Sequence, residues 1–356
     1  MVKPLRVAML APVAWRTPPL AYGPWEQVTS TLTEGLVARG IDVTLFATLD
    51  SVTTGRLDGI CPHGYGDDPA MDGRVWEALH VSHALARSAE YDLVHNHLDW
   101  LPLAFAAHSR VPMVTTIHGF SAPAILPAYE RAHSAYVSIS DADRVPELTY
   151  AATVYHGVDA GPLPLNPDPG PDAGLVAFGR IHPDKGTHEA IAIARRLGRR
   201  LTICGPVQDQ RYFDEQVAPS LDGDRVAYLG SVGPQGRAQV LGQASVLLHP
   251  IGFAEPFGLA VVESMLCGTP VVAYRRGSMA EIVDEGITGY LADDIESAAE
   301  HVAAAEALDR GAVRQGALQR FGVDAMVEGY LAVYEQVLSG GHGLVSQAQA
   351  THSRRC

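Results

Sequence analysis

Two basic side chains close together in the second half of the sequence could bind phosphate. The segment from Gly179 to Gly186 reads GRIHPDKG, so Arg180 and Lys185 follow a β-rich run and precede a helical pattern. A lysine ammonium and an arginine fork both suit phosphate oxygens, and a lysine can also form an imine. Lys185 is one of only two lysines in the chain, the other being Lys3. We expect the pair to neutralise a diphosphate; the alternative is that Lys185 is an ordinary surface charge.

Two glutamates follow in the segment FAEPFGLAVVES, with seven residues between them. Glu255 precedes Pro256, which we expect to start a helix, and Glu263 then lies about two turns along that helix. The amides of Gly258 and Leu259 could point at a phosphate, and carboxylates accept hydrogen bonds from the vicinal hydroxyls of a ribose or a sugar ring. The alternatives are a helix-dipole role for Glu255 and a solvated position for Glu263. Glu263 lies among apolar residues, however, where an unpaired carboxylate is costly.

Two other turns at strand ends give weaker signals. Gly23 lies between the first strand-like run and a helix with Pro24 in its first turn, where backbone N–H groups could meet an anion or a sugar oxygen. This turn is not a G-x-G-x-x-G dinucleotide pattern, and a plain helix start is the alternative. His118 ends a strand-like run and could hydrogen-bond a substrate hydroxyl or a leaving phosphate, although a lone histidine is more often structural.

No metal site is expected. The acidic pair Asp141 and Asp143 resembles a D-x-D metal motif, but it follows Ser140 at a predicted helix start, where acidic residues serve as caps. His95 and His97 could suggest a metal, yet no third ligand is evident near them.

These residues stand on a regular alternation of short β-rich runs and helical patterns, which predicts doubly wound parallel sheets of the α/β class. The alternation occurs twice, so we expect two Rossmann-like domains, with the chemistry in a cleft between them at the carboxyl ends of both sheets. Helical spans are predicted at residues 26–39 and 73–89. Strands are predicted at residues 5–10, 42–46, 92–95, 113–117 and 135–139, and again at 175–178, 201–204, 226–229, 246–249 and 270–273.

A proline-rich stretch separates the two halves. Residues 1–158 are expected to form one domain and residues 173–322 a second, with a linker at residues 159–172 whose prolines cannot continue a helix or a central strand. A helix at residues 323–338 is expected to return to the first domain. The tail at residues 339–356 is rich in Gly, Ser and Gln and is expected to be disordered.

Composition argues against several classes of protein. The formal charge of −14 opposes a broad nucleic-acid-binding face. Hydrophobic residues make up 47% of the chain, yet no apolar run reaches about 18 residues, so no integral membrane segment is expected. The chain enters a strand-like run almost at once, which argues against a signal peptide. Four cysteines without close pairing or metal-ligand spacing suggest a reduced, cytoplasmic protein.

The order and spacing of these features resemble the family-4 retaining glycosyltransferases, which have the two-domain GT-B fold. The two glutamates resemble that family's E-x7-E signature, and the resemblance covers nearly the whole chain. No single feature is specific, whereas their combined order is. The features are Gly23 with Glu26, His118-Gly119, Gly157-Val158-Asp159, the 179–186 segment, residues 268–273 and residues 277–289.

The resemblance implies that residues 1–158 form the acceptor-binding domain and residues 173–322 the nucleotide-sugar-binding domain. It also implies roles for the candidate residues of the second domain. Arg180 and Lys185, in the turn that Gly179 opens, resemble the pair that holds the donor's diphosphate. Glu263 resembles the ligand of the donor's ribose. The segment similar to a main-chain cradle for the base comprises Leu229, Gly230, Ser231 and Val232.

The resemblance also implies residues that contact the transferred sugar. Glu255, with the amides of Phe257 and Gly258, resembles a clamp on that sugar. His118 resembles the histidine near the anomeric centre and the sugar's 6-position. The family's first loop normally carries two glycines, whereas this chain has Gly23 followed by a proline, which puts a second amide contact in doubt.

The activity implied is that of a metal-independent retaining hexosyltransferase, which moves a sugar from a nucleotide-diphosphate donor to an acceptor hydroxyl. The donor is a substrate, expected to be UDP-linked because UDP is common in the family, and no cofactor is implied. The acceptor is expected to be a sugar or small molecule. The chain is also similar to transferases of antibiotic oligosaccharide pathways, such as that of avilamycin. The alternatives are a GT-B nucleotide-sugar epimerase, a non-catalytic sugar-nucleotide binding protein, and a pyridoxal-phosphate phosphorylase with Lys185 as its Schiff-base lysine.

Overall fold

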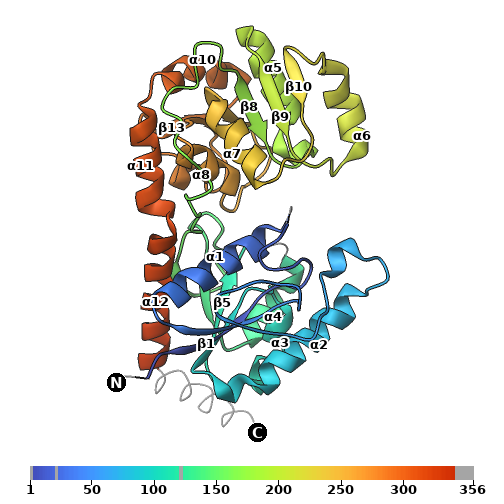
Figure 1. Cartoon of the computed structure of the whole chain (residues 1–356), viewed down its shortest axis with the longest axis vertical. Helices are drawn as coiled ribbons and strands as arrows, with labels where there is room; N and C mark the ends of the chain where they lie inside the picture. The colour runs from blue at the N-terminus through green and yellow to red at the C-terminus, as the bar shows by residue number, and fades with distance from the viewer. Residues whose placement is uncertain (1–2, 21–22, 120–122, 341–356) are drawn as a thin grey trace. The chain divides into compact units, whose positions relative to one another are not determined.

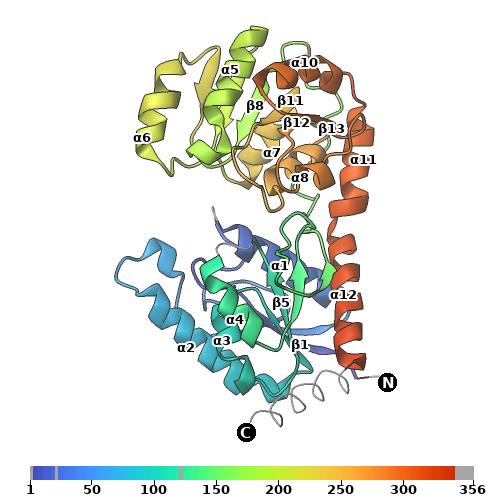
Figure 2. The same cartoon turned by 180° about the vertical axis from the view of Figure 1, so that it is seen from behind.

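The chain folds into two compact units, shown in a computed structural model that describes residues 3–20, 23–119 and 123–340 (Figure 1). The N-terminal unit contains the described residues up to Ile139, residues Arg144–Gly157 and the described residues from Val323 to Gly340. The C-terminal unit contains Val158–Gly322 together with Ser140–Asp143. Each unit carries its own parallel sheet, which can be followed in Figures 1 and 2.

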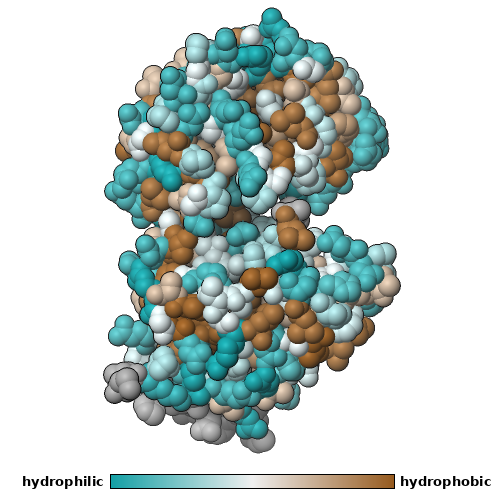
Figure 3. Space-filling view, viewed as in Figure 1, coloured by the Kyte–Doolittle hydropathy of each residue, from teal (hydrophilic) through white to brown (hydrophobic). Residues whose placement is uncertain are grey.

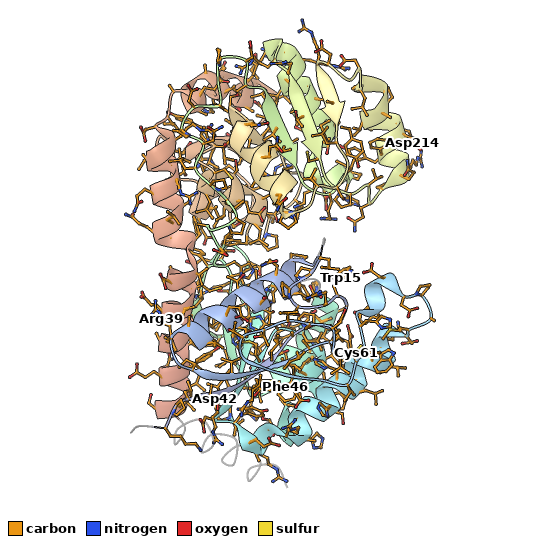
Figure 4. The ribbon with its side chains drawn as sticks, in the orientation of Figure 1. Trp15, Arg39, Asp42, Phe46, Cys61 and Asp214 are labelled. Carbon is orange, nitrogen blue, oxygen red and sulfur yellow. The ribbon has the colours of Figure 1, made fainter. Side chains whose placement is uncertain are left out.

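The N-terminal unit is built on a seven-stranded sheet in the order β3-β2-β1-β4-β5-β6-β7. Apolar side chains of the inner strands form a core cluster that includes Leu10, Phe46 (labelled in Figure 4) and Ile117. Its strands are β1 (Arg6–Leu10), β2 (Asp42–Phe46), β3 (Arg56–Asp58), β4 (Leu93–Asn96), β5 (Met113–Ile117), β6 (Ala135–Ser138) and β7 (Tyr150–Thr153). Its helices are α1 (Pro24–Ala38), α2 (Gly73–Ala86), α3 (Leu101–Ala104), α4 (Leu126–Arg131) and α12 (Val323–Ser339).

The helix α12 belongs to the N-terminal unit, although it follows the last element of the C-terminal unit in sequence. It lies beside α1, where Gly35 leaves room for Val323 and Val327. Arg39, at the end of α1 (Figure 4), forms an ion pair of 2.6 Å with Asp324. The helix ends at Ser339, and most of the tail predicted from residue 339 lies outside the described residues.

The C-terminal unit is built on a six-stranded parallel sheet in the order β10-β9-β8-β11-β12-β13. Its strands are β8 (Leu175–Phe178), β9 (Leu201–Cys204), β10 (Val226–Tyr228), β11 (Val246–His249), β12 (Val271–Tyr274) and β13 (Gly289–Ala292). Its helices are α5 (Thr187–Leu197), α6 (Gln210–Tyr212), α7 (Pro234–Gln243), α8 (Leu259–Leu266), α9 (Met279–Ile282), α10 (Ile295–Glu306) and α11 (Arg310–Phe321). Residues 159–172 contain no helix or strand.

Two local predictions are wrong. The helix α8 begins at Leu259 and not at Pro256, because Gly258 at its N-cap has a φ of 90°, a left-handed conformation that cannot continue a helix. Glu263 is therefore about one turn along the helix. No helix starts after Ser140: the Glu281 carboxylate accepts hydrogen bonds from the amides of Asp141 and Ala142, at 2.8 and 2.7 Å, and holds the segment as a turn.

On the face of the molecule in Figure 3, hydrophilic and hydrophobic residues are mixed on both units. Within the described ranges, no helix is long and apolar enough to cross a membrane.

Candidate functional site

The strand order of each sheet reverses at one point, and the candidate residues named here follow strands at that point or, for His118, one strand further along the sheet. In the C-terminal unit the chain runs outward from β8 to β9 and β10, then returns to β11 on the other side of β8. Lys185 follows β8, and Glu255 follows β11. In the N-terminal unit the reversal lies between β1 and β4; Gly23 follows β1, and His118 follows β5. Ligands of doubly wound sheets bind at such reversal points, at the carboxyl ends of the strands.

A tight turn brings Lys185 to this edge of the sheet. After β8, a short 3-10 turn at Pro183–Lys185 leads into α5, and Gly186 joins the two with a φ of 66°. A Cβ atom on Gly186 would lie 1.8 Å from the carbonyl oxygen of Pro250, just beyond β11. Only glycine allows this approach, so the turn packs directly against the chain that carries Glu255.

Lys185 and Glu255 form an ion pair in which Nζ lies 2.5 Å from Oε2. The two side chains are 17% and 10% exposed, so the pair is shielded but still reachable from solvent. The ammonium also lies 4.6 Å from the centre of the Phe253 ring. Burial alone would raise the pKa of Glu255, but neighbouring His249 and the charge of Lys185 outweigh it and lower the pKa to about 2. The carboxylate is therefore ionised at neutral pH and can act only as an acceptor.

His249 is the buried neighbour of the Glu255 carboxylate. Its Nε2 lies 3.5 Å from Oε2 of Glu255, and the ring is 6% exposed. Burial lowers the pKa of His249, which favours the neutral imidazole despite the adjacent carboxylate. Because the His249 ring is neutral, Lys185 is the cation that pairs with the Glu255 carboxylate.

Arg180 lies on the same turn as Lys185. Its guanidinium donates to the Gln208 side chain and lies 3.4 Å from Oδ2 of Asp184. Asp184 in turn lies 2.7 Å from Nδ1 of His182. The two predicted phosphate ligands thus occupy one loop, and each is held by a carboxylate that a stronger anion could displace or share.

Glu263 pairs with an arginine that the sequence did not single out. Arg237, in α7, places Nη1 2.6 Å from Oε1 of Glu263. Burial raises the pKa of Glu263, and the charge and hydrogen bond of Arg237 oppose the rise. One signal could have identified this partner, because a glutamate within the apolar run of α8 requires a cation nearby.

The predicted base cradle follows β10. Gly230 has a φ of 72°, and its carbonyl oxygen accepts a hydrogen bond of 2.9 Å from the amide of Gly205. Ser231 is exposed and Val232 is half-buried on the loop that leads into α7. Phe257 is buried, with its carbonyl oxygen bonded to the Ser278 hydroxyl.

In the N-terminal unit, the start of α1 lies against His118. Gly23 is the N-cap of α1, and the Trp25 ring stacks on the His118 ring with centres 5.3 Å apart and planes inclined by 19°. Glu26 is 2% exposed and accepts a hydrogen bond of 3.3 Å from the amide of Trp15. Burial raises the pKa of Glu26 to about 7, against the opposing effect of its backbone hydrogen bonds.

Both ring nitrogens of His118 are engaged by other histidines. Nε2 lies 2.8 Å from Nδ1 of His97, and Nδ1 lies 3.4 Å from Nε2 of His156. Burial, together with these neighbours, holds the pKa of His118 well below its ordinary value, so the ring is neutral at physiological pH. A hydrogen bond from this ring to a substrate would require one of the two contacts to be exchanged.

The other histidine of the predicted pair is buried in a hydrogen-bond network. His95 bonds to the hydroxyls of Tyr334 and Thr116 at 2.6 and 2.8 Å. In the part of the chain that the structure covers, no group of three or more His, Cys, Asp or Glu side chains could hold a metal ion.

Family models match most of each unit. The model described as Glycosyltransferase Family 4 matches residues 25–146, and the model described as Glycosyl transferases group 1 matches residues 167–316. The glycogen synthase of Mycobacterium tuberculosis (strain ATCC 25618 / H37Rv) is 28% identical over 336 residues, which covers 78% of this chain and 80% of that protein. The D-inositol 3-phosphate glycosyltransferase 1 of Catenulispora acidiphila is 29% identical over 316 residues, covering 73% and 75%.

Solved structures agree with these matches. AviGT4, a glycosyltransferase involved in avilamycin A biosynthesis, is 26% identical with a TM-score of 0.72, covering 95% of this chain and 99% of that one. HepE of Anabaena, solved in complex with UDP and glucose, is 20% identical with a TM-score of 0.71, covering 93% and 100%, which shows a shared fold.

The two parallel sheets and these matches define the protein as a glycosyltransferase with the GT-B fold. Within that class, its N-terminal part corresponds to the family 4 domain and its C-terminal part to the group 1 domain.

Proposed function

We propose that the protein transfers a sugar from a UDP-linked donor to a hydroxyl of a sugar or small-molecule acceptor, with retention of anomeric configuration and without a metal. The observation that carries this proposal is the Lys185–Glu255 pair at the reversal point of the C-terminal sheet. A cation and an ionised carboxylate side by side match the two chemical ends of a nucleotide sugar, the diphosphate and the sugar hydroxyls. HepE of Anabaena, which shares the fold, has been solved with UDP-glucose, which supports a UDP-linked donor.

The donor diphosphate would be held by Lys185, Arg180 and the start of α8. A lysine ammonium has three N–H donors, so Lys185 can keep its contact to Glu255 while it donates to a phosphate oxygen. The amides near Gly258 and Leu259 face the open N-terminal end of α8, where the helix dipole favours an anion. Glu255 and Glu263 would accept hydrogen bonds from the sugar and the ribose.

The transfer would break the bond between the anomeric carbon and the diphosphate oxygen and form a bond from that carbon to the acceptor oxygen. Lys185 and Arg180 stabilise the negative charge that develops on the departing diphosphate, the role a metal plays in other transferases. In a retaining reaction without a covalent intermediate, the acceptor attacks from the side of the leaving group. The acceptor's proton then passes to the departing phosphate oxygen.

The acceptor would bind the N-terminal unit, near Gly23 and Trp25. The likeness to AviGT4 supports a glycosylated small molecule as the acceptor class. His118 is the proposed contact to the transferred sugar. The hydrogen bond it would exchange is the one to His156, because at 3.4 Å it is the longer of its two.

A donor screen followed by product analysis tests the proposal. Thermal-shift measurements with UDP, GDP, ADP and dTDP select the nucleotide, and its sugar donors are then incubated with simple alkyl glycosides. Proton NMR of the product should show the donor's anomeric configuration retained. An inverted product contradicts the proposal, as does an epimerised donor formed without acceptor. Nucleotide binding with no turnover of any donor would indicate a binding module instead.

A further inference from the structure

Arg237 joins three elements of the C-terminal unit at one point. It lies in the first turns of α7, and its guanidinium is 5.5 Å from the centre of the Phe178 ring, the last residue of β8. Phe178 directly precedes Gly179 and the turn that carries the phosphate-binding candidates. Nη1 of Arg237 reaches Glu263 of α8 at 2.6 Å. The arginine is therefore clamped between an aromatic ring and a carboxylate, a geometry that a planar guanidinium suits.

This contact favours the ionised form of Glu263, against the effect of its burial. The Glu263 side chain is 13% exposed, and Arg237 is the one hydrogen-bond partner found for it within the described residues. A carboxyl buried in this way would otherwise favour its protonated form. An ionised carboxylate offers about four acceptor positions and no donor, whereas a protonated one offers a donor in place of some of them.

We infer that Arg237 is a positioning residue that holds Glu263 as an acceptor for both vicinal hydroxyls of a ribose, and that the donor site thereby selects ribonucleoside diphosphates over 2′-deoxyribonucleoside diphosphates. The inference rests on the proposed function, in which Glu263 binds the donor's ribose. Arg237 uses one acceptor position of Oε1 and leaves those of Oε2 open, so two hydroxyl donors can be met on one carboxylate. A 2′-deoxyribose supplies one donor fewer and leaves a shielded carboxylate lone pair unmet.

Calorimetric titration with UDP and with 2′-deoxy-UDP tests this inference. The unmodified protein should bind UDP roughly tenfold more tightly, since a hydrogen bond to a charged group contributes about that much. Arg237→Met should bring the two affinities to within about twofold, mostly by weakening UDP. Arg237→Lys, which restores a charge beside Glu263, should recover most of the preference. Glu263→Gln should lose it while keeping the side-chain volume.

Arg211→Met is the matched control. Arg211 forms an ion pair of 2.8 Å with Glu215 in the same unit, but its side chain is 84% exposed. This variant should keep the full preference for UDP. Equal weakening of both nucleotides by Arg237→Met, or no change in either, would overturn the inference. If the unmodified protein binds neither nucleotide, the proposed UDP-linked function itself fails.

Discussion

Among the carboxyl groups of the N-terminal unit, Glu26 has the pKa that burial raises most. Its pKa of about 7 in the folded protein exceeds its ordinary value of 4.5, because the side chain is almost fully buried. The folded state therefore binds a proton between pH 4.5 and 7 that the unfolded state has released. The free energy of unfolding falls as pH rises through this window, and the full penalty of ionisation applies above it.

Glu26→Gln should remove that penalty. We expect the variant to be more stable than the unmodified protein at pH 8 by up to about 3 kcal/mol, and equally stable below pH 4.5. Urea unfolding at a series of pH values measures the difference. The exposed Glu147 of the same unit provides the control, because Glu147→Gln should change stability little at any pH. A Glu26→Gln effect that does not depend on pH would contradict this account.

The sequence predicted the residues of the proposed donor site by type but not their partners. Arg180, Lys185 and Glu255 could be identified because they lie in turns that follow strands. Glu263 could be identified because its carboxylate lies within an apolar run. The contact between Lys185 and Glu255 joins residues 70 positions apart, and only the packing of Gly186 on Pro250 brings them together. Arg237 was missed because an arginine in a helix carries no pattern of its own.

At the scale of elements, the start of α11 is tied to three other segments by one buried side chain. Arg310 is 9% exposed and donates to the carbonyl oxygens of Asn166, Gly242 and Ala244. It also bonds to the Thr269 hydroxyl at 2.5 Å. The linker before β8, the end of α7 and the loop before β12 therefore share one guanidinium.

Arg310→Met should destabilise the C-terminal unit by about 3 kcal/mol, because it leaves several buried oxygens without a donor. This corresponds to a loss of roughly 10 °C in melting temperature. Differential scanning calorimetry measures the shift, and the exposed Arg211→Met serves as the comparison with no expected change. A shift of less than about 1 °C for Arg310→Met would show that water replaces the guanidinium without loss.

The strands that were not predicted from the sequence all lie at sheet edges. β3, β7 and β13 are all edge strands. Edge strands are paired on one side only and need no continuous apolar run, and the sequence RLD of β3 is mostly exposed. The inner strands were predicted because they are buried on both faces, and the edge strand β10 was predicted from its short apolar run. The start of α8 was misplaced because the proline signal precedes Gly258, whose left-handed conformation delays the helix.

At the scale of the whole molecule, the repeated strand–helix alternation was enough to predict two parallel α/β sheets and hence the fold class. The strand order was not readable, since it depends on which strands pair after the chain reverses. The helix at residues 323–338 was expected to return to the first domain, and α12 lies in the N-terminal unit. The GT-B fold and the two family matches place the reaction within sugar transfer, whereas donor and acceptor rest on the proposed contacts.

The proposed reaction needs no metal ion, so removing metal ions from the protein should not affect sugar transfer. If Lys185, Arg180 and the start of α8 neutralise the diphosphate, sugar transfer should continue at an unchanged rate after dialysis against EDTA. Adding Mg²⁺ or Mn²⁺ to the dialysed protein should not raise the rate. Loss of transfer in EDTA that either ion restores would show that a cation from solution completes the site.

The central claim is that Lys185 binds the donor's diphosphate, and comparison of UDP with uridine tests it most directly. Calorimetry on the unmodified protein, Lys185→Arg and Lys185→Met isolates the contribution of the two phosphates from that of the nucleoside. We predict that UDP binds the unmodified protein at least tenfold more tightly than uridine does, that Lys185→Met removes most of this difference, and that Lys185→Arg reduces it. A difference between UDP and uridine that persists unchanged in Lys185→Met would contradict the account.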